Sequence, residues 1–450
     1  MDFYSYVHAH RQTILDTTMR LLAIESVLDS YQPDSLAPFG EGIQEALTMM
    51  LQLAKKDGFV VKNIQNHAGH IEHGTGEGLL GVLCHLDVVP AGEGWTSKPF
   101  EPTLKNGRLY ARGAMDDKGP TMAAYFALKF LKDLDVPMHK RVRIILGTDE
   151  ETAWRGIRRY FEFEAMPDLG FAPDASFPLI YGEKGIWTFD VLGEGTTGDL
   201  VFFKAGERYN VVPDRAECQL KGDHSEAFLE FCSHYGFKGD IVDDVFIVHG
   251  KNAHAMQPNA GVNAGFIMAK FLRERVDDPF VRFIDDLLSF DAFGEKLSID
   301  YDDPEMKRFT INPGIVRYDE HGAKLGINCR YPKNYDLDQA RDVVQKHVKD
   351  YGLTFDEQSD LPVHYVSPDD TLVKHLMDAY QKITNDKTSK PITIGGGTYA
   401  RALEKAVAFG PLMPGREDVV HQADEYIYID DLLEATAIYM EAIYALTRDP

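Results

Sequence analysis

The chain has 450 residues, of which 44% are hydrophobic and 26% are charged, a composition typical of a folded protein with more than one domain. It has 47 Lys and Arg residues against 71 Asp and Glu residues, a formal net charge of −24, which argues against a nucleic-acid partner because phosphates would be repelled. The sequence has neither an apolar run long enough for a membrane span nor a signal-peptide pattern at its start, so we expect a cytoplasmic protein with no membrane partner.

The cysteines are too few and too scattered for a disulfide framework. Cys84, Cys218, Cys232 and Cys329 include no pair with C-x-x-C spacing. A disulfide-bonded scaffold and a structural zinc knuckle are therefore both disfavoured.

The first part of the chain alternates between helices and strands. Apolar residues recur at helical spacing over 10–29 and 40–56. Further elements follow between about residue 59 and residue 185: strands at 79–84 and 141–146, and helices at 120–134 and 152–163. Such alternation is typical of a largely parallel sheet covered by helices.

The pattern changes after about Lys184, where half-exposed strands are separated by Gly and Asp. Strands are expected at 186–192, 200–204, 216–220, 244–249, 309–316 and 325–331, and helices at 225–235, 262–273 and 337–351. A helix at 372–383 and a last helix at 429–446 then resume the first pattern. We predict an α/β fold in which a domain of residues 1–185 and 366–450 is interrupted by an α+β domain of residues 186–365, with two similar halves as a further possibility for the insertion.

Polar side chains follow the predicted strands at the point where each strand ends. His85 and Asp87 follow the apolar run 79–84, and open α/β sheets gather their active-site groups at the carboxyl ends of strands. A carboxylate beside a metal-binding His is a common way to orient its ring. The alternative is a capping Asp next to an ordinary, partly buried His.

Two pairs of acidic residues strengthen the case for metal binding. Asp116 and Asp117 precede a predicted helix, where they could cap it or place one carboxylate between two cations. Glu150 and Glu151 follow the second strand; they could favour a helix N-terminus, or one could bind metal while the other acts as a general base. With Asp174 as a further candidate ligand, imidazole and carboxylate groups without Cys suit zinc, manganese or cobalt, and their number suggests two ions.

The ordered set His-x-Asp, Asp-Asp-Lys-Gly, Asp-Glu-Glu and Pro-Asp-Ala resembles the dinuclear zinc metallopeptidases of the aminoacylase, carnosinase and glutamate carboxypeptidase group, and within it the PepV-type dipeptidase branch. The resemblance covers nearly the whole chain. It implies a catalytic domain interrupted by a lid domain, and two divalent metal ions, with zinc favoured over manganese and cobalt. The implied metal ligands are His85, Asp116 as the bridge, Glu151, Asp174 and His421, with Asp87 orienting His85 and Glu150 as the general base.

The insertion also contains motifs of this family. His254, in Gly250-Lys251-Asn252-Ala253-His254-Ala255, resembles the lid histidine that polarises the scissile carbonyl. Asn210 and Arg330 resemble lid residues that bind substrate, and Arg330 could hold a carboxylate with two hydrogen bonds. The turn containing Gly396, Gly397 and Thr398 would contact substrate or simply be a tight turn that leads into a helix. In this branch the lid histidine comes from the same chain, so a monomer is favoured over a dimer.

These features together predict a metal-dependent dipeptidase that hydrolyses unblocked dipeptides through a metal-activated water. Its partner would be a small peptide substrate. The alternative within enzymes is a related amide hydrolase, such as an N-acyl amino acid deacylase or a desuccinylase. A protein that only captures peptides or metal complexes is a rival from another class, but such a protein has no need of a free base such as Glu150 beside its ligands.

Overall fold

The structure is a computed structural model that describes residues 2–196 and 198–449. It forms two compact units: unit 1 is Met1–Tyr181, Tyr365–Ile392 and Thr398–Pro450, and unit 2 is Gly182–His364 and Thr393–Gly397. The short stretch Thr393–Gly397 groups with unit 2, whereas the sequence placed it within the resumed first domain. Within residues 2–196 and 198–449, no helix has the length and apolar character needed to cross a membrane.

Unit 1 is built on a mixed sheet with the strand order β1-β2-β6-β3-β7-β22-β9-β20, and β21 pairs with β9. Its strands are β1 (Val60–Ile64), β2 (Ala68–His73), β3 (Leu79–His85), β6 (Arg141–Gly147), β7 (Leu169–Ala172), β9 (Ile180–Glu183), β20 (His364–Tyr365), β21 (Ile392–Ile394) and β22 (Ala406–Ala408). The central neighbours β6, β3, β7 and β22 are parallel, while β1 and β2 are antiparallel. The prediction of a largely parallel sheet is confirmed for its centre. Every residue of β3 is buried, as expected of a parallel strand covered on both faces.

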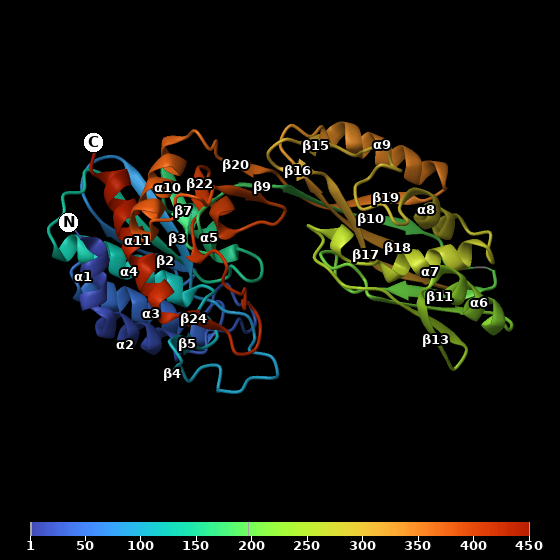
Figure 1. Ribbon diagram of the computed structural model, residues 1–450, viewed down its shortest axis with the longest axis horizontal. Helices are drawn as coiled ribbons and strands as arrows, with labels where there is room; N and C mark the ends of the chain where they lie inside the picture. Colours follow the sequence, from blue (N-terminus) through green and yellow to red (C-terminus); the bar gives the residue numbers. More distant parts are fainter. Residues whose placement is uncertain (1, 197, 450) are drawn as a thin grey trace. The chain divides into compact units, whose positions relative to one another are not determined.

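Helices cover this sheet (Figure 1). They are α1 (Phe3–Ala9), α2 (Arg11–Leu22), α3 (Glu41–Lys56), α4 (Lys118–Asp133), α5 (Arg155–Phe161), α10 (Thr371–Thr384), α11 (Ile429–Thr447) and the short η2 (Tyr399–Ala402). The helices α4 and α11 pack on each other and on β6, and most residues of both are buried. Two small sheets complete the unit: β4 (Thr103–Lys105), β5 (Arg108–Tyr110) and β24 (Tyr426–Tyr428) form one, and β8 (Ala175–Ser176) with β23 (Pro411–Leu412) forms the other.

The helix predicted over residues 10–29 is wrong beyond Leu22, where α2 ends. Ser26 instead lies along the segment after β3: its hydroxyl donates to the Leu86 carbonyl at 2.6 Å, and its own carbonyl accepts from Val88 N at 3.0 Å. Ser is prone to leave a helix because its side chain can bond backbone groups in other conformations.

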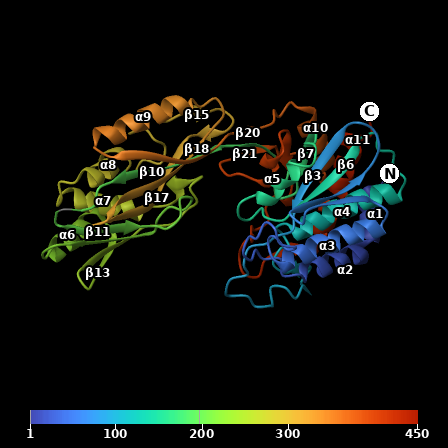
Figure 2. The same cartoon turned by 180° about the vertical axis from the view of Figure 1, so that it is seen from behind.

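Unit 2 is built on an antiparallel sheet with the order β13-β14-β12-β11-β17-β18-β10-β19. Its strands are β10 (Gly185–Gly193), β11 (Leu200–Ala205), β12 (Arg215–Leu220), β13 (Lys238–Val242), β14 (Val245–His249), β17 (Thr310–Asp319), β18 (Gly322–Tyr331) and β19 (Thr354–Leu361), with the small pair β15 (Asp302–Asp303) and β16 (Lys307–Arg308). The helices are α6 (Ser225–Tyr235), η1 (Pro258–Ala260), α7 (Ala264–Arg273), α8 (Pro279–Leu287) and α9 (Leu337–Asp350). Figures 1 and 2 show α7 and α9 beside the strands that they contact. The predicted α+β character of the insertion is confirmed.

Candidate active site

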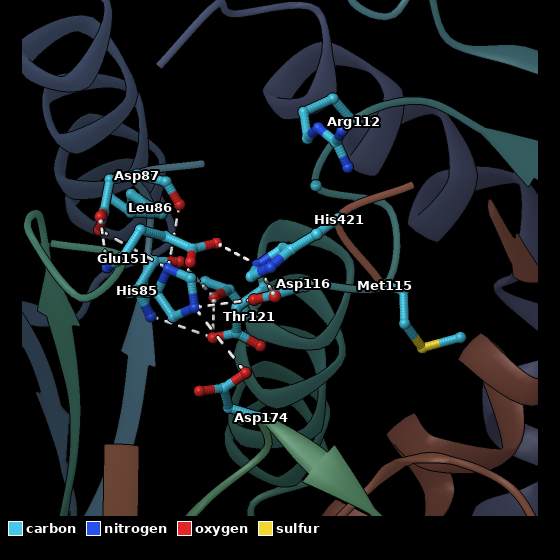
Figure 3. A network of polar contacts seen from close by, with 12 residues as sticks. His85, Leu86, Asp87, Arg112, Met115, Asp116, Thr121, Glu151, Asp174 and His421 are labelled. Carbon is cyan, nitrogen blue, oxygen red and sulfur yellow. Dashed lines mark hydrogen bonds and ion pairs between the residues drawn. The ribbon is translucent and has the colours of Figure 1, made fainter. Parts of the chain in front are cut away.

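The parallel strands of unit 1 bring the predicted metal-binding motifs to one edge of the sheet. His85 is the last residue of β3 and pairs in register with Gly147, the last residue of β6. The segments that carry Asp87 and Glu151 therefore leave the sheet at the same level, and Asp174 follows the neighbouring strand β7. Figure 3 shows these side chains turned toward one another, together with Asp116 and His421.

The ring of His85 is held in one orientation. His85 is fully buried; its Nδ1 lies 3.0 Å from the carbonyl oxygen of Asp87 and 3.6 Å from the Asp87 carboxylate. Since a carbonyl can only accept, Nδ1 donates, and a neutral ring then has its lone pair on Nε2. That Nε2 lies 3.0 Å from Asp116 Oδ1 and 3.8 Å from Asp174 Oδ1, so it faces two acceptors.

The carboxylate of Asp116 lies between the two histidines. While Oδ1 faces His85, Oδ2 lies 3.0 Å from His421 Nε2, and the same nitrogen lies 3.0 Å from Glu151 Oε1. Donor atoms of His85, Asp116 and Asp174 lie within 4.8 Å of one another, as do those of Asp116, Glu151 and His421. Asp116 is thus common to two groups, each with the size and atom types of a cation site.

The electrostatics of this cluster call for added positive charge. Burial, followed by the charge of Asp116, raises the pKa of Asp174 to about 6. Hydrogen bonds to Asp116 and Glu151 raise the pKa of His421 to about 10. Buried carboxylates that face imidazole lone pairs are stable only when a proton or a metal cation lies among them. The residues present therefore fit two divalent cations, one in each group.

Asp87 contributes through both its main chain and its side chain. Its carbonyl orients His85, while its carboxylate Oδ2 accepts from Glu151 N at 3.0 Å. This contact ties the end of β3 to the turn that carries Glu150. Among the described residues, nothing donates a hydrogen bond to the Glu150 carboxylate, and burial, followed by the charge of Asp174, raises its pKa well above the usual range. Such a carboxylate is a stronger proton acceptor than an exposed one.

Helix capping does not explain the acidic pairs. The helix α4 begins at Lys118, but the Asp117 side chain makes no cap hydrogen bond; it accepts from His85 N at 3.0 Å instead. The helix α5 begins at Arg155, later than the predicted residue 152, and Asp149 accepts from its first N–H at 2.9 Å. Glu150 and Glu151 precede that helix and have no such capping role.

Four of the five residues predicted to bind substrate, Asn210, Arg330, Gly396 and Gly397, belong to unit 2. The carbonyl of Asn210 accepts from Ala255 N at 2.9 Å, and Val211 forms an isolated β-bridge with His254. Arg330, on β18, donates from Nη1 to the carbonyl of Gly395 at 3.1 Å, which anchors the turn that contains Gly396 and Gly397. Thr398 belongs to unit 1, where its hydroxyl accepts from Ala400 N at 3.3 Å and caps η2.

His254 is exposed, and its tautomer is defined by a local contact. Its Nδ1 accepts from Met256 N at 3.1 Å, so a neutral ring carries its proton on Nε2. Although His254 is exposed, neighbouring atoms shield its ring from part of the solvent; this desolvation, followed by the charge of Arg330, lowers its pKa and favours the neutral form at pH 7. The same Met256 packs against the glycine turn, since a Cβ added to Gly395 would lie 2.8 Å from Met256 Cβ.

Two residues beside the cluster were not found from the sequence. The Tyr399 ring is buried at 88° to the ring of His85 with centroids 5.9 Å apart, and its hydroxyl fills the space beside Gly147, where a Cβ would lie 2.1 Å from it. Glu425 is fully buried and paired with Arg112 at 2.6 Å. Its position four residues after His421 is the one feature of the sequence that could have placed it near the cluster. That signal is weak, because acidic residues usually face solvent.

Comparison with known proteins places this chain in one family. The model of peptidase family M20/M25/M40 matches residues 81–445, and the chain belongs to this family. Among curated proteins it is 45% identical over 467 residues to "Putative dipeptidase YtjP" of Bacillus subtilis (strain 168), covering 100% of both chains. It is 44% identical over 461 residues to a protein of the same description from Staphylococcus aureus (strain COL), covering 98% of each.

Solved structures show the same fold at low sequence identity. Human carnosine dipeptidase 1 matches with a TM-score of 0.58 at 16% identity, covering 99% of this chain and 98% of that one. The dipeptidase Dug1p of Saccharomyces cerevisiae matches with a TM-score of 0.58 at 13% identity, covering 100% and 98%. At these identities the comparison concerns the fold alone.

Proposed function

We propose that this protein is a metal-dependent dipeptidase that hydrolyses the peptide bond of unblocked dipeptides. The observation that carries the proposal is the position of Asp116, whose two carboxylate oxygens each lie 3.0 Å from a different histidine nitrogen. Membership of a peptidase family supports hydrolysis as the reaction, and the full-length relatives support dipeptides as the substrate class.

The two groups of unit 1 would hold the cations, zinc in preference to manganese or cobalt. His85, Asp116 and Asp174 would hold one, and Asp116, Glu151 and His421 the other. When bound, such ions polarise a carbonyl oxygen and lower the pKa of water.

Glu150 would move the proton during hydrolysis. It would accept the proton of the attacking water and return it to the leaving amine, which is the usual division of work for a single carboxylate base. No described residue donates a hydrogen bond to its carboxylate, so the group is not engaged elsewhere, and its raised pKa makes it a stronger proton acceptor. Asp87 would keep it in place indirectly, because its carboxylate holds the adjacent Glu151 N–H at 3.0 Å.

The residues of unit 2, together with Thr398 of unit 1, would bind the substrate itself. His254 would donate from Nε2 to the carbonyl oxygen as negative charge develops there. Arg330, oriented by Asn328 Oδ1 at 2.8 Å and the Gly395 carbonyl, would bind the C-terminal carboxylate. Asn210 and the turn with Gly396, Gly397 and Thr398 would complete the contacts. We further propose a cytoplasmic monomer.

The test is hydrolysis of a dipeptide panel by purified protein after chelation and after metal add-back. We expect unblocked dipeptides to be cleaved only after add-back. Matched N-acetyl and N-succinyl amino acids belong in the same panel. Faster cleavage of the acylated amino acids would assign the site to the related amide hydrolases instead, and binding without turnover of any substrate would assign it to a capture protein.

A further inference from the structure

The loop that leads to Asp116 is held by one buried carboxylate from the far end of the chain. Glu425 is 0% exposed, and four N–H groups point at its two oxygens. Oε2 accepts from Arg112 Nη1 at 2.6 Å and from Gly113 N at 3.2 Å. Oε1 accepts from Met115 N at 2.8 Å and from Asp116 N at 3.1 Å.

This arrangement suits a carboxylate better than an amide of the same shape. An ionised carboxylate accepts at both oxygens and donates nothing, whereas an amide of the same shape would turn an NH₂ group toward two of the four donors. The charge is balanced by Arg112, which is 1% exposed. Arg112 is held in turn by the Ala91 carbonyl at 3.2 Å from Nη2. Figure 3 shows Arg112 and Met115 on the loop that carries Asp116.

Glu425 also belongs to the segment that carries His421. Its main-chain carbonyl accepts from Ala111 N at 3.1 Å, and the neighbouring Asp424 accepts from Thr96 N at 2.8 Å. The segment of His421 and the loop of Asp116 are therefore joined through both the side chain and the main chain of one residue. His421 Nε2 and Asp116 Oδ2, 3.0 Å apart, lie just beyond this joint.

We propose that Glu425, with Arg112, is a positioning residue that sets Asp116 and His421 at the separation needed to hold the second cation. The proposal rests on the dinuclear site of the proposed function. Glu425 does not itself contact a cation, because its oxygens are both engaged by N–H donors. It acts by holding the main chain of Asp116 so that one carboxylate oxygen faces each histidine.

The experiment is a titration of the metal-free protein with cobalt(II) chloride, followed by visible absorption, which reports each ion as it is bound. The variants are Glu425→Gln and Arg112→Lys. The matched control is Glu72→Gln, which also removes a carboxylate from an arginine pair in unit 1, since Glu72 accepts from Arg143 Nε at 2.8 Å between β2 and β6. Thermal unfolding by circular dichroism is recorded for every variant.

We expect wild type and Glu72→Gln to bind two equivalents alike. Glu425→Gln should bind the first nearly as well and the second about 10- to 100-fold more weakly, the range found when groups that orient metal ligands are changed. Arg112→Lys keeps the charge but loses the planar fork, so we expect a smaller loss of the second ion. Second-ion binding by Glu425→Gln equal to that of wild type would overturn the proposal.

Two further outcomes separate the possible failures. If wild type does not bind two equivalents, the dinuclear function fails, and this inference with it; if wild type binds two and the variants do the same, only the positioning role fails. If Glu425→Gln does not fold, Arg112→Lys decides, and an unchanged second step in that variant overturns the proposal.

Discussion

The two units of this protein hold polar groups of opposite kinds. In unit 1, partly buried carboxylates such as Asp116 and Asp174 crowd around His85 and His421. In unit 2, the gathered groups are donors: the exposed His254, with its proton on Nε2, and the guanidinium of Arg330. A cluster of acceptors is stable only with added cations, whereas a set of donors suits an anionic or polarised substrate group. The contrast predicts that unit 1 needs metal ions and that the donors of unit 2 bind substrate.

The largest expected effect is the loss of activity when metal is removed, which tests the role proposed for unit 1. Chelation should abolish peptide hydrolysis, because unit 1 cannot function as a set of acceptors alone, and zinc, manganese or cobalt should restore it. The measurement is dipeptide turnover alongside elemental analysis, with magnesium and calcium as hard-cation controls that suit all-oxygen sites better. Full activity in protein shown to contain no transition metal would contradict the proposed site.

The next largest effect concerns the base in unit 1. Glu150→Gln keeps the shape of the side chain but cannot accept a proton, so kcat should fall by about 100-fold or more, with metal content close to that of wild type. Glu162→Gln, which changes a carboxylate paired with Arg159 on the surface of the same unit, is the matched control. Turnover by metal-loaded Glu150→Gln near that of the control would remove Glu150 from the mechanism.

A test of unit 2 is His254→Ala, which removes one donor. We expect kcat to fall by about 100-fold and metal content to remain unchanged, since no metal-type group includes this residue among the described residues. His249→Ala, which alters a partly exposed histidine paired with Asp240 at 2.7 Å on β14, is the control.

The same variant tests the proposed monomer. Mixing His254→Ala with Glu150→Gln should restore no activity if each chain supplies its own histidine. Recovered activity in the mixture would show that His254 serves a second chain and would reject the monomer.

The smallest expected effect is the difference in kcat/KM between a dipeptide and its amide, which tests the role assigned to Arg330. Loss of one charge-assisted contact, worth about 1.5–3 kcal/mol, should lower kcat/KM by about 10- to 100-fold for a dipeptide amide relative to the free dipeptide. Arg330→Lys should lose most of this discrimination, because a lysine cannot form the paired contact. The control Arg273→Lys, at a partly exposed arginine of unit 2 that lies 3.6 Å from Asp286, should keep it. Equal kcat/KM for the dipeptide, its amide and a tetrapeptide would favour a broader amidohydrolase.

Much of this protein could be predicted from short stretches of its sequence. Apolar runs ending at Cys84 and Leu146 predicted parallel strands. The polar residues after them predicted a cluster at one sheet edge, because parallel strands end on the same side. Helix periodicity also located α6 and α9 well, because the apolar residues of an amphipathic helix recur every three or four residues and so can be read from a short stretch of sequence.

Other features depend on residues far apart in the chain, and local patterns do not contain them. His421 was indicated by family resemblance rather than by spacing, since it meets Glu151 across 270 positions. The end of α2 depends on Ser26 reaching Leu86, and the pairing of Glu425 with Arg112 spans 313 positions. Sequence alone determined which chemical groups were available and which strands carried them. Packing decided which groups meet, because only the folded chain brings the N–H groups of Arg112, Gly113, Met115 and Asp116 to the buried carboxylate of Glu425.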